Sequence, residues 1–368
     1  MCVPVRSTQQ RGIRAMSMRR LIKWISDLGI PGLRQRRRGQ AHHRGQMTHV
    51  LILDGTMSTL AEGFESNAGL TYKLLDEIGG PSLSIYYEAG LQWQDWRSTR
   101  DIITGGGLNR QIRRAYGYLA SRYRPGDRIF LFGYSRGAFA VRSLAGAIDK
   151  VGLLRAEHAT ERNVNLAYRH YRSINPNGAM SEFREAYCHE TVEIEMIGVW
   201  DTVKALGWRL PILWRFKEDS HAFHNHALSP VVRHGYHALA LDETRAAFEP
   251  VMWHAPEGGK GRVEQVWFRG THGDVGGHLG SFHEARPLSN IPLVWMLEKA
   301  EACGLALPGE WHKRFACDPE APSVGRWRGW GKLFLIRRER VVGADPSEHL
   351  HPSVRRDDPH LTTPQRVV

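Results

Sequence analysis

Short apolar runs alternate with helical periods along most of this chain. The apolar runs have the composition of buried strands and span residues 49–53, 82–87, 129–132, 192–200 and 263–268. Residues with helical spacing fill three of the intervals, at about 69–78, 108–123 and 136–148. Strands separated by helices of this length predict an α/β fold built on a mostly parallel, doubly wound sheet. In such a sheet the ligand site lies beyond the carboxyl ends of the strands.

Four stretches depart from this alternation. Residues 152–190 are helical and polar and predict a small cap. Residues 204–234 are irregular and aromatic, which is typical of a mobile lip over a pocket. Residues 237–245, HALALDETR, consist mainly of good helix formers and predict a helix. Residues 270–277 follow the last predicted strand and form a glycine-rich loop.

Residues 128–142, RIFLFGYSRGAFAVR, combine a strand, a sharp turn and a helix. Gly133, Ser135 and Gly137 form a G-x-S-x-G motif between the apolar run and the helical pattern. That context is typical of a nucleophile elbow, a strained turn that exposes the serine hydroxyl at a strand end. The residues two before and two after the serine must lack bulk, and both are glycine. The alternative is an ordinary Gly-Ser turn ahead of a helix.

Ser135, Asp201 and His272 each follow a predicted strand, in the chain order serine, aspartate, histidine. This is the order of an α/β-hydrolase triad. A serine hydroxyl needs an imidazole to accept its proton, and a carboxylate fixes the imidazole tautomer. Asp274 competes with Asp201 as the partner of His272. Side chains two residues apart on one loop rarely meet in the required geometry, so we expect Asp274 to hydrogen-bond loop amides instead.

Backbone amides near the serine are the expected donors to an oxyanion. The amide of Arg136, at the start of the helix, is one. The amide of Gly55 or Thr56, in the loop after the first strand, is the other. We expect Asp54, just before them, to shape this loop by hydrogen bonding. Asp54-Gly55-Thr56 also resembles the nucleophile motif of haloacid-dehalogenase phosphatases, but that motif requires a second acid where Gly55 stands.

We expect no metal and no cofactor. Asp54, His272 and Asp274 offer oxygen and nitrogen ligands, but no further ligand cluster accompanies them. The four cysteines lack C-x-x-C spacing, which argues against a zinc site and predicts free thiols in a reducing compartment. The chain has 368 residues, 42% of them hydrophobic, enough for one large folded domain. No run approaches 18 uncharged apolar residues, so we expect no transmembrane helix.

Positive charge is concentrated at the N-terminus. Residues 1–47 hold eleven Arg and Lys and one acid, which accounts for ten of the twelve net positive charges. The remainder is nearly neutral and gives no argument for nucleic-acid binding. Apolar and basic positions across residues 18–28 are typical of a short amphipathic helix that lies on an anionic membrane. The alternatives are a disordered extension or a start codon assigned too early, with Met47 as the true start.

Six motifs together resemble a known family. They are ILDGT (52–56), YYEAG (86–90), LFGYSRGAFAVR (131–142), GVWDTV (198–203), HALALDETR (237–245) and WFRGTHGDVGG (267–277). In this order they are similar to the catalytic domain of bacterial type VI secretion phospholipase effectors, from about residue 48 to 298. HLHPSV (349–354) resembles the family's closing segment. The resemblance implies an α/β-hydrolase fold whose triad is the serine of GYSRG, the aspartate of GVWDTV and the histidine of GTHGDVGG.

These observations predict a leader over residues 1–47 and an α/β-hydrolase catalytic domain over residues 48–368, with cap insertions at about 152–190 and 204–234. The expected activity is a serine ester hydrolase that cleaves acyl esters through an acyl-enzyme, with phospholipids as the substrate that the resemblance implies. The alternative is a non-catalytic module that binds an acyl group or a protein on the same fold. We expect synthesis in the cytoplasm, with export by a signal-less secretion system as an open alternative.

Overall fold

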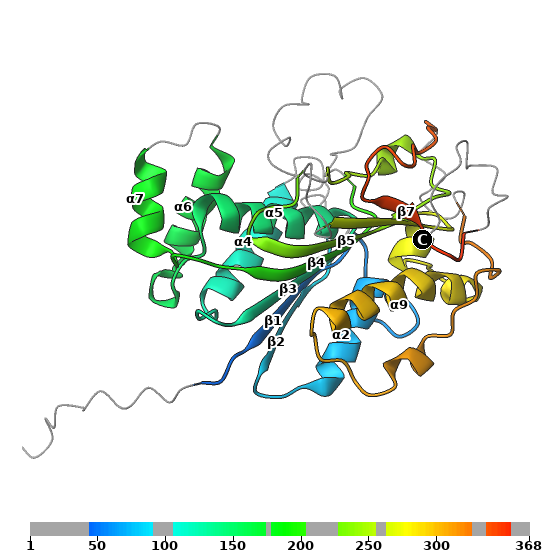
Figure 1. Cartoon of the computed structure of the whole chain (residues 1–368), viewed down its shortest axis with the longest axis horizontal. Helices are drawn as coiled ribbons and strands as arrows, with labels where there is room; N and C mark the ends of the chain where they lie inside the picture. Colours follow the sequence, from blue (N-terminus) through cyan, green and yellow to red (C-terminus); the bar gives the residue numbers. More distant parts are fainter. Residues whose placement is uncertain are drawn as a thin grey trace, which may run out of the picture. The chain divides into compact units, whose positions relative to one another are not determined.

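Seven parallel strands form one sheet in the computed structural model of this chain (Figure 1). The structure describes residues 44–90, 106–173, 178–203, 227–254, 263–325 and 336–354. Among these residues the strand order is β2-β1-β3-β4-β5-β6-β7. The strands are β1 (Thr48–Leu53), β2 (Leu83–Glu88), β3 (Arg128–Tyr134), β4 (Ile194–Trp200), β5 (Val232–Ala240), β6 (Val263–Phe268) and β7 (Glu348–Leu350). The predicted α/β fold with a doubly wound parallel sheet of α/β-hydrolase type is confirmed.

Helices cover both faces of the sheet. They are α2 (Asn67–Ile78), α4 (Gly106–Ala120), α5 (Arg136–Val151), α6 (Glu161–Arg172), α7 (Gly178–Tyr187), α8 (His272–Gly276) and α9 (Arg286–Ala302). Short 3₁₀ turns lie at η1 (Ala156–His158), η4 (Ala246–Phe248), η5 (His283–Ala285) and η6 (Trp311–Arg314). In Figure 1, α4, α5 and α6 lie on one side of the sheet, and α2 and α9 lie on the other.

Alternation along the central strands explains the two layers. Leu51 and Leu53 of β1 belong to the core cluster formed with α4, α5 and α6. Val50 and Ile52 point the other way, into the cluster formed with α2 and α9. All four side chains are fully buried. A parallel strand that is covered on both faces is a nearly continuous apolar run, and such a run can be recognised in the sequence.

The helix predicted over residues 237–245 is wrong. Residues 232–240 form β5, which pairs in parallel register with β4 on one side and β6 on the other. Ala238, Leu239 and Ala240 are fully buried there. The helix propensity of these residues favours a helix by only roughly a few tenths of a kcal/mol per residue. Strand pairing on both sides and burial on both faces outweigh this preference. Within the predicted loop 270–277, residues 272–276 form the short helix α8.

Several predictions concern residues outside the described part. The leader, apart from residues 44–47, and residues 204–226 of the predicted lip lie there, so both stay predictions. For residues 232–234 the predicted irregular lip is wrong, because they begin β5 and pair with β4. In the predicted cap, α6 and α7 pack against α5 through Val164, Tyr171 and Phe183; their role as a cap stays a prediction.

The cysteines of the described residues form no disulfide. Cys188, Cys303 and Cys317 are free thiols. No group of three or more His, Cys, Asp or Glu side chains in the described ranges is arranged to hold a metal ion. In the same ranges, no helix has the length and apolar character needed to cross a membrane.

Candidate active site

The turn between β3 and α5 has the strained geometry of a nucleophile elbow. Ser135 adopts φ 57° and ψ −118°, a conformation that costs a side-chain-bearing residue about 1–3 kcal/mol. Its amide donates to the carbonyl oxygen of Trp200 at 3.0 Å, which ties the turn to the end of β4. A Cβ atom on Gly137 would lie 2.0 Å from the carbonyl oxygen of Leu53. Glycine is therefore required where α5 crosses the end of β1.

Ser135, His272 and Asp201 form one continuous hydrogen-bonded row. The Oγ of Ser135 lies 2.9 Å from Nε2 of His272. The Nδ1 of His272 lies 2.6 Å from Oδ2 of Asp201. Ser135 and His272 are 7% and 6% exposed and Asp201 is fully buried, so solvent does not reach the aspartate. The three predicted residues come from three separate strand ends and meet in the order that proton transfer from a serine requires.

A residue that the sequence did not single out, Arg340, holds the carboxylate of Asp201. Its Nη1 donates to Oδ1 of Asp201 at 2.6 Å, and its Nη2 donates to Oδ2 at 2.9 Å. The same guanidinium donates to the carbonyl oxygens of Ala240 and Phe248 at 2.7 and 2.5 Å. Burial alone would raise the pKa of Asp201. The charge of Arg340 and the hydrogen bond from His272 outweigh burial and hold this pKa well below its usual range.

Strand β5 supports the turn that carries Asp201. The amide of Asp201 donates to the carbonyl oxygen of Ala238 at 2.8 Å. The next amide, that of Thr202, donates to Nε2 of His237 at 3.1 Å. Burial lowers the pKa of His237 to about 3, so this imidazole stays neutral and can accept the bond. Asp201 itself has a positive φ of 42°, and these bonds keep its backbone in that conformation.

Aromatic rings and a second carboxylate fix the position of His272. The ring of Phe248 lies 4.6 Å from the imidazole, and the ring of Tyr134 lies 5.0 Å from it. The amide of His272 donates to Oε2 of Glu243 at 3.2 Å. Glu243 is itself paired with Arg245 at 2.5 Å. The imidazole is thus held from several sides before any ligand binds.

Asp54 organises the loop between β1 and α2, as predicted. Its Oδ1 accepts from the amide of Gly55 at 2.6 Å. Its Oδ2 accepts from Oγ of Ser66 at 2.6 Å and from the hydroxyl of Tyr87 at 2.8 Å. Burial raises the pKa of Asp54, although these bonds oppose the rise. Asp54 occupies the Gly55 amide, whereas the Thr56 amide has no hydrogen-bond partner among the described residues.

Asp274 binds its own loop and not the imidazole. Its Oδ2 accepts from the amide and the hydroxyl of Thr271 at 2.7 and 2.8 Å. That oxygen also accepts from Oγ of Ser323 at 2.5 Å, and Oδ1 accepts from the amide of Val324 at 2.7 Å. These bonds fasten the start of α8 to a segment about fifty residues later. Of the two competing acids, Asp201 contacts the imidazole.

Arg340 had no recognisable signal in the sequence. It stands in the run Arg337-Arg338-Glu339-Arg340, which reads as a solvated charged surface. Its side chain is nevertheless only 4% exposed. Ser66 was likewise missed. Tyr87 belongs to the motif YYEAG (86–90), but the motif did not indicate that its hydroxyl binds Asp54. Contacts of this kind join residues far apart in the chain and follow no local period.

A comparison with protein families identifies the family of this chain. A model described as "T6SS, Phospholipase effector Tle1-like, catalytic domain" matches residues 47–299. The chain belongs to this family. The family resemblance predicted from the six motifs is confirmed, and it places the chain among hydrolases of the lipase and phospholipase type. Arg340, Ser323 and Val324 lie beyond the matched segment. A bacterial source stays a prediction.

Individual relatives of this Tle1-like domain are more distant. "Uncharacterized protein YEL023C" of Saccharomyces cerevisiae is 27% identical over 239 residues, and the match covers 58% of this chain and 33% of the yeast protein. A crystal structure of an uncharacterized protein from Pseudomonas aeruginosa shares 16% identity, with a TM-score of 0.43, over 78% of this chain and 51% of that one. The Tle1 effector bound to the VgrG spike shares 17% identity, with a TM-score of 0.35, over 65% and 53%. The chain thus spans a third to about half of these proteins.

Replacing Asp274 should affect stability more than chemistry. In Asp274→Asn, one of two acceptor oxygens becomes an NH₂ group that faces buried donors. We expect the free energy of unfolding to fall by about 3 kcal/mol, with hydrolysis of a soluble ester retained in the folded fraction. Urea denaturation and ester kinetics on the same preparation measure both quantities. Asp318→Asn, on an exposed site of the same C-terminal part, is the control. A fully stable but inactive Asp274→Asn enzyme would contradict this assignment.

Removing Arg340 should produce a pH-dependent loss of stability. Arg340→Gln leaves the buried carboxylate of Asp201 without its charged partner, and we expect a loss of about 3 kcal/mol at neutral pH. A lowered carboxyl pKa contributes stability above the ordinary value of 3.8 and loses it as the pH falls toward the folded-state value. The difference between wild type and variant should therefore shrink on acidification, as urea denaturation at several pH values will measure.

The control for this experiment is Arg338→Gln. Arg338 lies two residues away and forms an exposed pair with Glu249 at 3.3 Å, which contributes little. Equal losses in the two variants, or a difference that grows on acidification, would show that Arg340 does not act through Asp201.

Proposed function

We propose that this chain is a serine ester hydrolase that cleaves acyl esters through an acyl-enzyme, with phospholipids as its substrate class. The row Ser135–His272–Asp201, with heavy-atom distances of 2.9 and 2.6 Å, is the observation that carries the proposal. A hydroxyl that is close enough to pass its proton to an oriented imidazole is the arrangement of an activated serine nucleophile. Membership of a phospholipase effector family supports the substrate class.

The proposed reaction has two halves, acylation and deacylation, and Ser135, His272 and Asp201 take part in both. Oγ of Ser135 attacks the ester carbonyl carbon while Nε2 of His272 takes its proton. The tetrahedral intermediate collapses, the alcohol leaves with that proton, and the acyl group stays on the serine. A water molecule then repeats the sequence, with His272 as base and afterwards as acid, and the fatty acid is released. Asp201 keeps the proton of His272 on Nδ1, so that Nε2 begins as an acceptor.

Two backbone amides are proposed for the oxyanion. The amide of Arg136 follows the nucleophile at the N-terminus of α5, where the helix dipole adds a partial positive charge. The amide of Thr56 is the second donor, since Asp54 already occupies the amide of Gly55. Asp54 would then act by holding the loop, and Gly133 and Gly137 by allowing the turn. No step of this reaction requires a metal ion or a cofactor.

The nucleophile is tested by Ser135→Ala. This change removes one oxygen and leaves every charge in place, so we expect an unchanged melting temperature and a kcat lower by on the order of 10³ to 10⁶. The control, Ser121→Ala, alters an exposed serine after α4 and should behave as wild type. A fluorophosphonate probe should label wild type and the control but not Ser135→Ala. Unlabelled wild type without esterase activity would favour the non-catalytic binding module instead.

Asp201→Asn should lower kcat by on the order of 10⁴, because the amide favours the wrong imidazole tautomer. Since Arg340 would face a neutral group, this variant should also lose stability, unlike Ser135→Ala. Kinetics are therefore measured at a temperature where circular dichroism shows the variant folded. Normal turnover by folded Asp201→Asn would remove it from the proposed triad.

We also propose that residues 18–28 contact anionic membranes. Deletion of residues 1–46 should leave turnover of a short soluble ester unchanged. It should weaken binding to anionic vesicles at low salt, and high salt should weaken binding of the intact chain in the same way. Vesicle sedimentation and ester kinetics test both statements. Equal vesicle binding by both proteins would leave the leader as an inert extension.

A further inference from the structure

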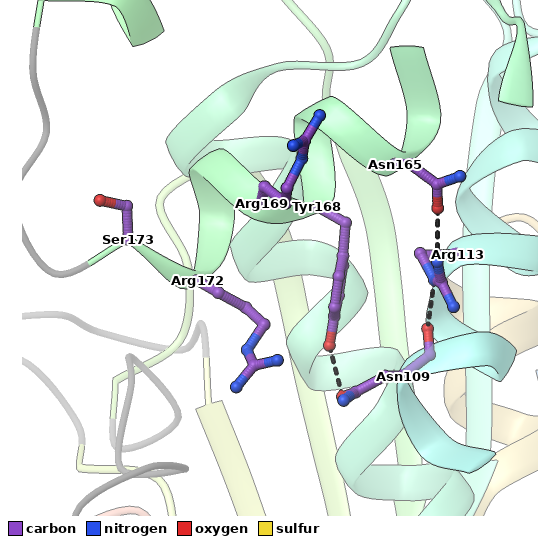
Figure 2. A pocket seen from close by; sticks show the side chains of 7 residues that line it. All are labelled: Asn109, Arg113, Asn165, Tyr168, Arg169, Arg172 and Ser173. Carbon is purple, nitrogen blue, oxygen red and sulfur yellow. Dashed lines mark hydrogen bonds between the residues drawn. The ribbon is translucent and has the colours of Figure 1, made fainter. Parts of the chain in front are cut away.

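A basic pocket lies between α4 and α6, apart from the serine site. Its volume is about 500 Å³, and none of its described lining residues belongs to the serine site or its hydrogen-bonding partners (Figure 2). Three arginines face it, together with two asparagines and a tyrosine: Arg113, Arg169, Arg172, Asn109, Asn165 and Tyr168. The described residues around this pocket include no carboxylate. The charge inside is therefore positive and has no counter-charge from those residues.

The wall formed by α4 is fixed before any ligand binds. Arg113 donates from Nε to the carbonyl oxygen of Asn109 at 3.3 Å and from Nη1 to Oδ1 of Asn165. The hydroxyl of Tyr168 donates to Oδ1 of Asn109 at 2.6 Å. Figure 2 shows the Arg113–Asn165 and Tyr168–Asn109 bonds joining the two helices. A guanidinium has five N–H donors, so Arg113 keeps donors in addition to the two it uses here.

Arg169 and Arg172 do not cap the C-terminal carbonyl groups of α6. Basic residues in the last turn of a helix commonly bind its terminal carbonyl groups. Here Lys150 of α5 does so, with Nζ donating to the carbonyl oxygens of Tyr171 and Ser173 at 3.1 and 2.7 Å. Within the described part of the chain, neither arginine has a hydrogen bond or an ion pair from its guanidinium. Both are exposed, and both line the pocket.

We propose that this pocket binds a phosphate-bearing ligand. Guanidinium groups match phosphate oxygens in shape and charge and bind them with paired, charge-assisted hydrogen bonds. Three arginines around one cavity supply that recognition, and the Asn and Tyr side chains keep Arg113 in position. The pocket is larger than a phosphate group alone, so the ligand carries an organic part. The phosphate comes either from a lipid headgroup or from a soluble phosphate monoester.

Titration calorimetry with inorganic phosphate and with glycerol 3-phosphate tests the pocket on the full chain. We expect saturable binding of glycerol 3-phosphate to wild type, and binding weaker by at least about tenfold in the double variant Arg169→Gln, Arg172→Gln. Ser135→Ala should bind as wild type does, so a failure of the proposed hydrolase activity leaves this test unaffected. Both substituted side chains are exposed, and the melting temperature should not change.

A matched double variant, Arg122→Gln and Arg162→Gln, removes the same charge. Both arginines are exposed, near the end of α4 and the start of α6 respectively, and neither lines the pocket. This control should retain affinity within about twofold, because its effect is limited to screened long-range attraction. An equal loss in the two double variants would overturn the proposal, since binding would then follow net charge.

Vesicles distinguish the two sources of phosphate. Phosphatidylcholine vesicles with and without phosphatidylglycerol are sedimented with wild type and both double variants, all of which carry the same leader. Loss of phosphatidylglycerol-dependent binding in the pocket variant alone assigns the site to a lipid headgroup. Loss of glycerol 3-phosphate binding with vesicle binding intact assigns it to a soluble phosphate compound. A pocket variant equal to wild type in both measurements would refute the proposal.

Discussion

The buried charge of Asp201 is the constraint on which the site depends. A carboxylate without solvent must be compensated by charge and hydrogen bonds, or its ionised form is lost. His272 and Arg340 supply that compensation from positions 71 and 139 residues away in the chain. The loop after β6 and the segment before β7 are therefore both drawn to the end of β4. An ionised carboxylate behind the imidazole is also what the proposed chemistry requires, so stability and the proposed activity would depend on the same contact.

Two further buried carboxylates, Asp54 and Asp274, are held by hydrogen bonds in loops near Ser135. Asp54 accepts hydrogen bonds from Gly55, Ser66 and Tyr87 and thereby shapes the loop after β1. Asp274 accepts four hydrogen bonds, two of which join α8 to residues 323 and 324. Each carboxylate closes one loop at the carboxyl edge of the sheet, and the strained turn at Ser135 lies among them. Such loops would otherwise have many conformations, so the site is ordered largely by polar contacts that are deeply buried.

The polypeptide that holds the site extends beyond the segment matched by the family model. That segment ends at residue 299, whereas Arg340 and the residues that bind Asp274 come later. The same later part contributes β7, which pairs with β6 at the edge of the sheet. The folded unit around the candidate site is therefore longer than the segment that carries the family motifs, because the partner of a buried charge can come from a distant part of the chain.

Local pattern determined much of this protein from sequence alone. Five of the strands, the helices between the early strands, the elbow at Ser135 and the order of the three site residues all follow from short periodic runs and small residues at a turn. Such features depend on neighbours in the chain. Tertiary structure alone decided that residues 232–240 are a strand, that Arg340 binds Asp201, and that Asp54 takes the Gly55 amide and leaves that of Thr56. Those outcomes depend on strand pairing, burial and charge compensation between distant segments, where local preference is too weak to decide.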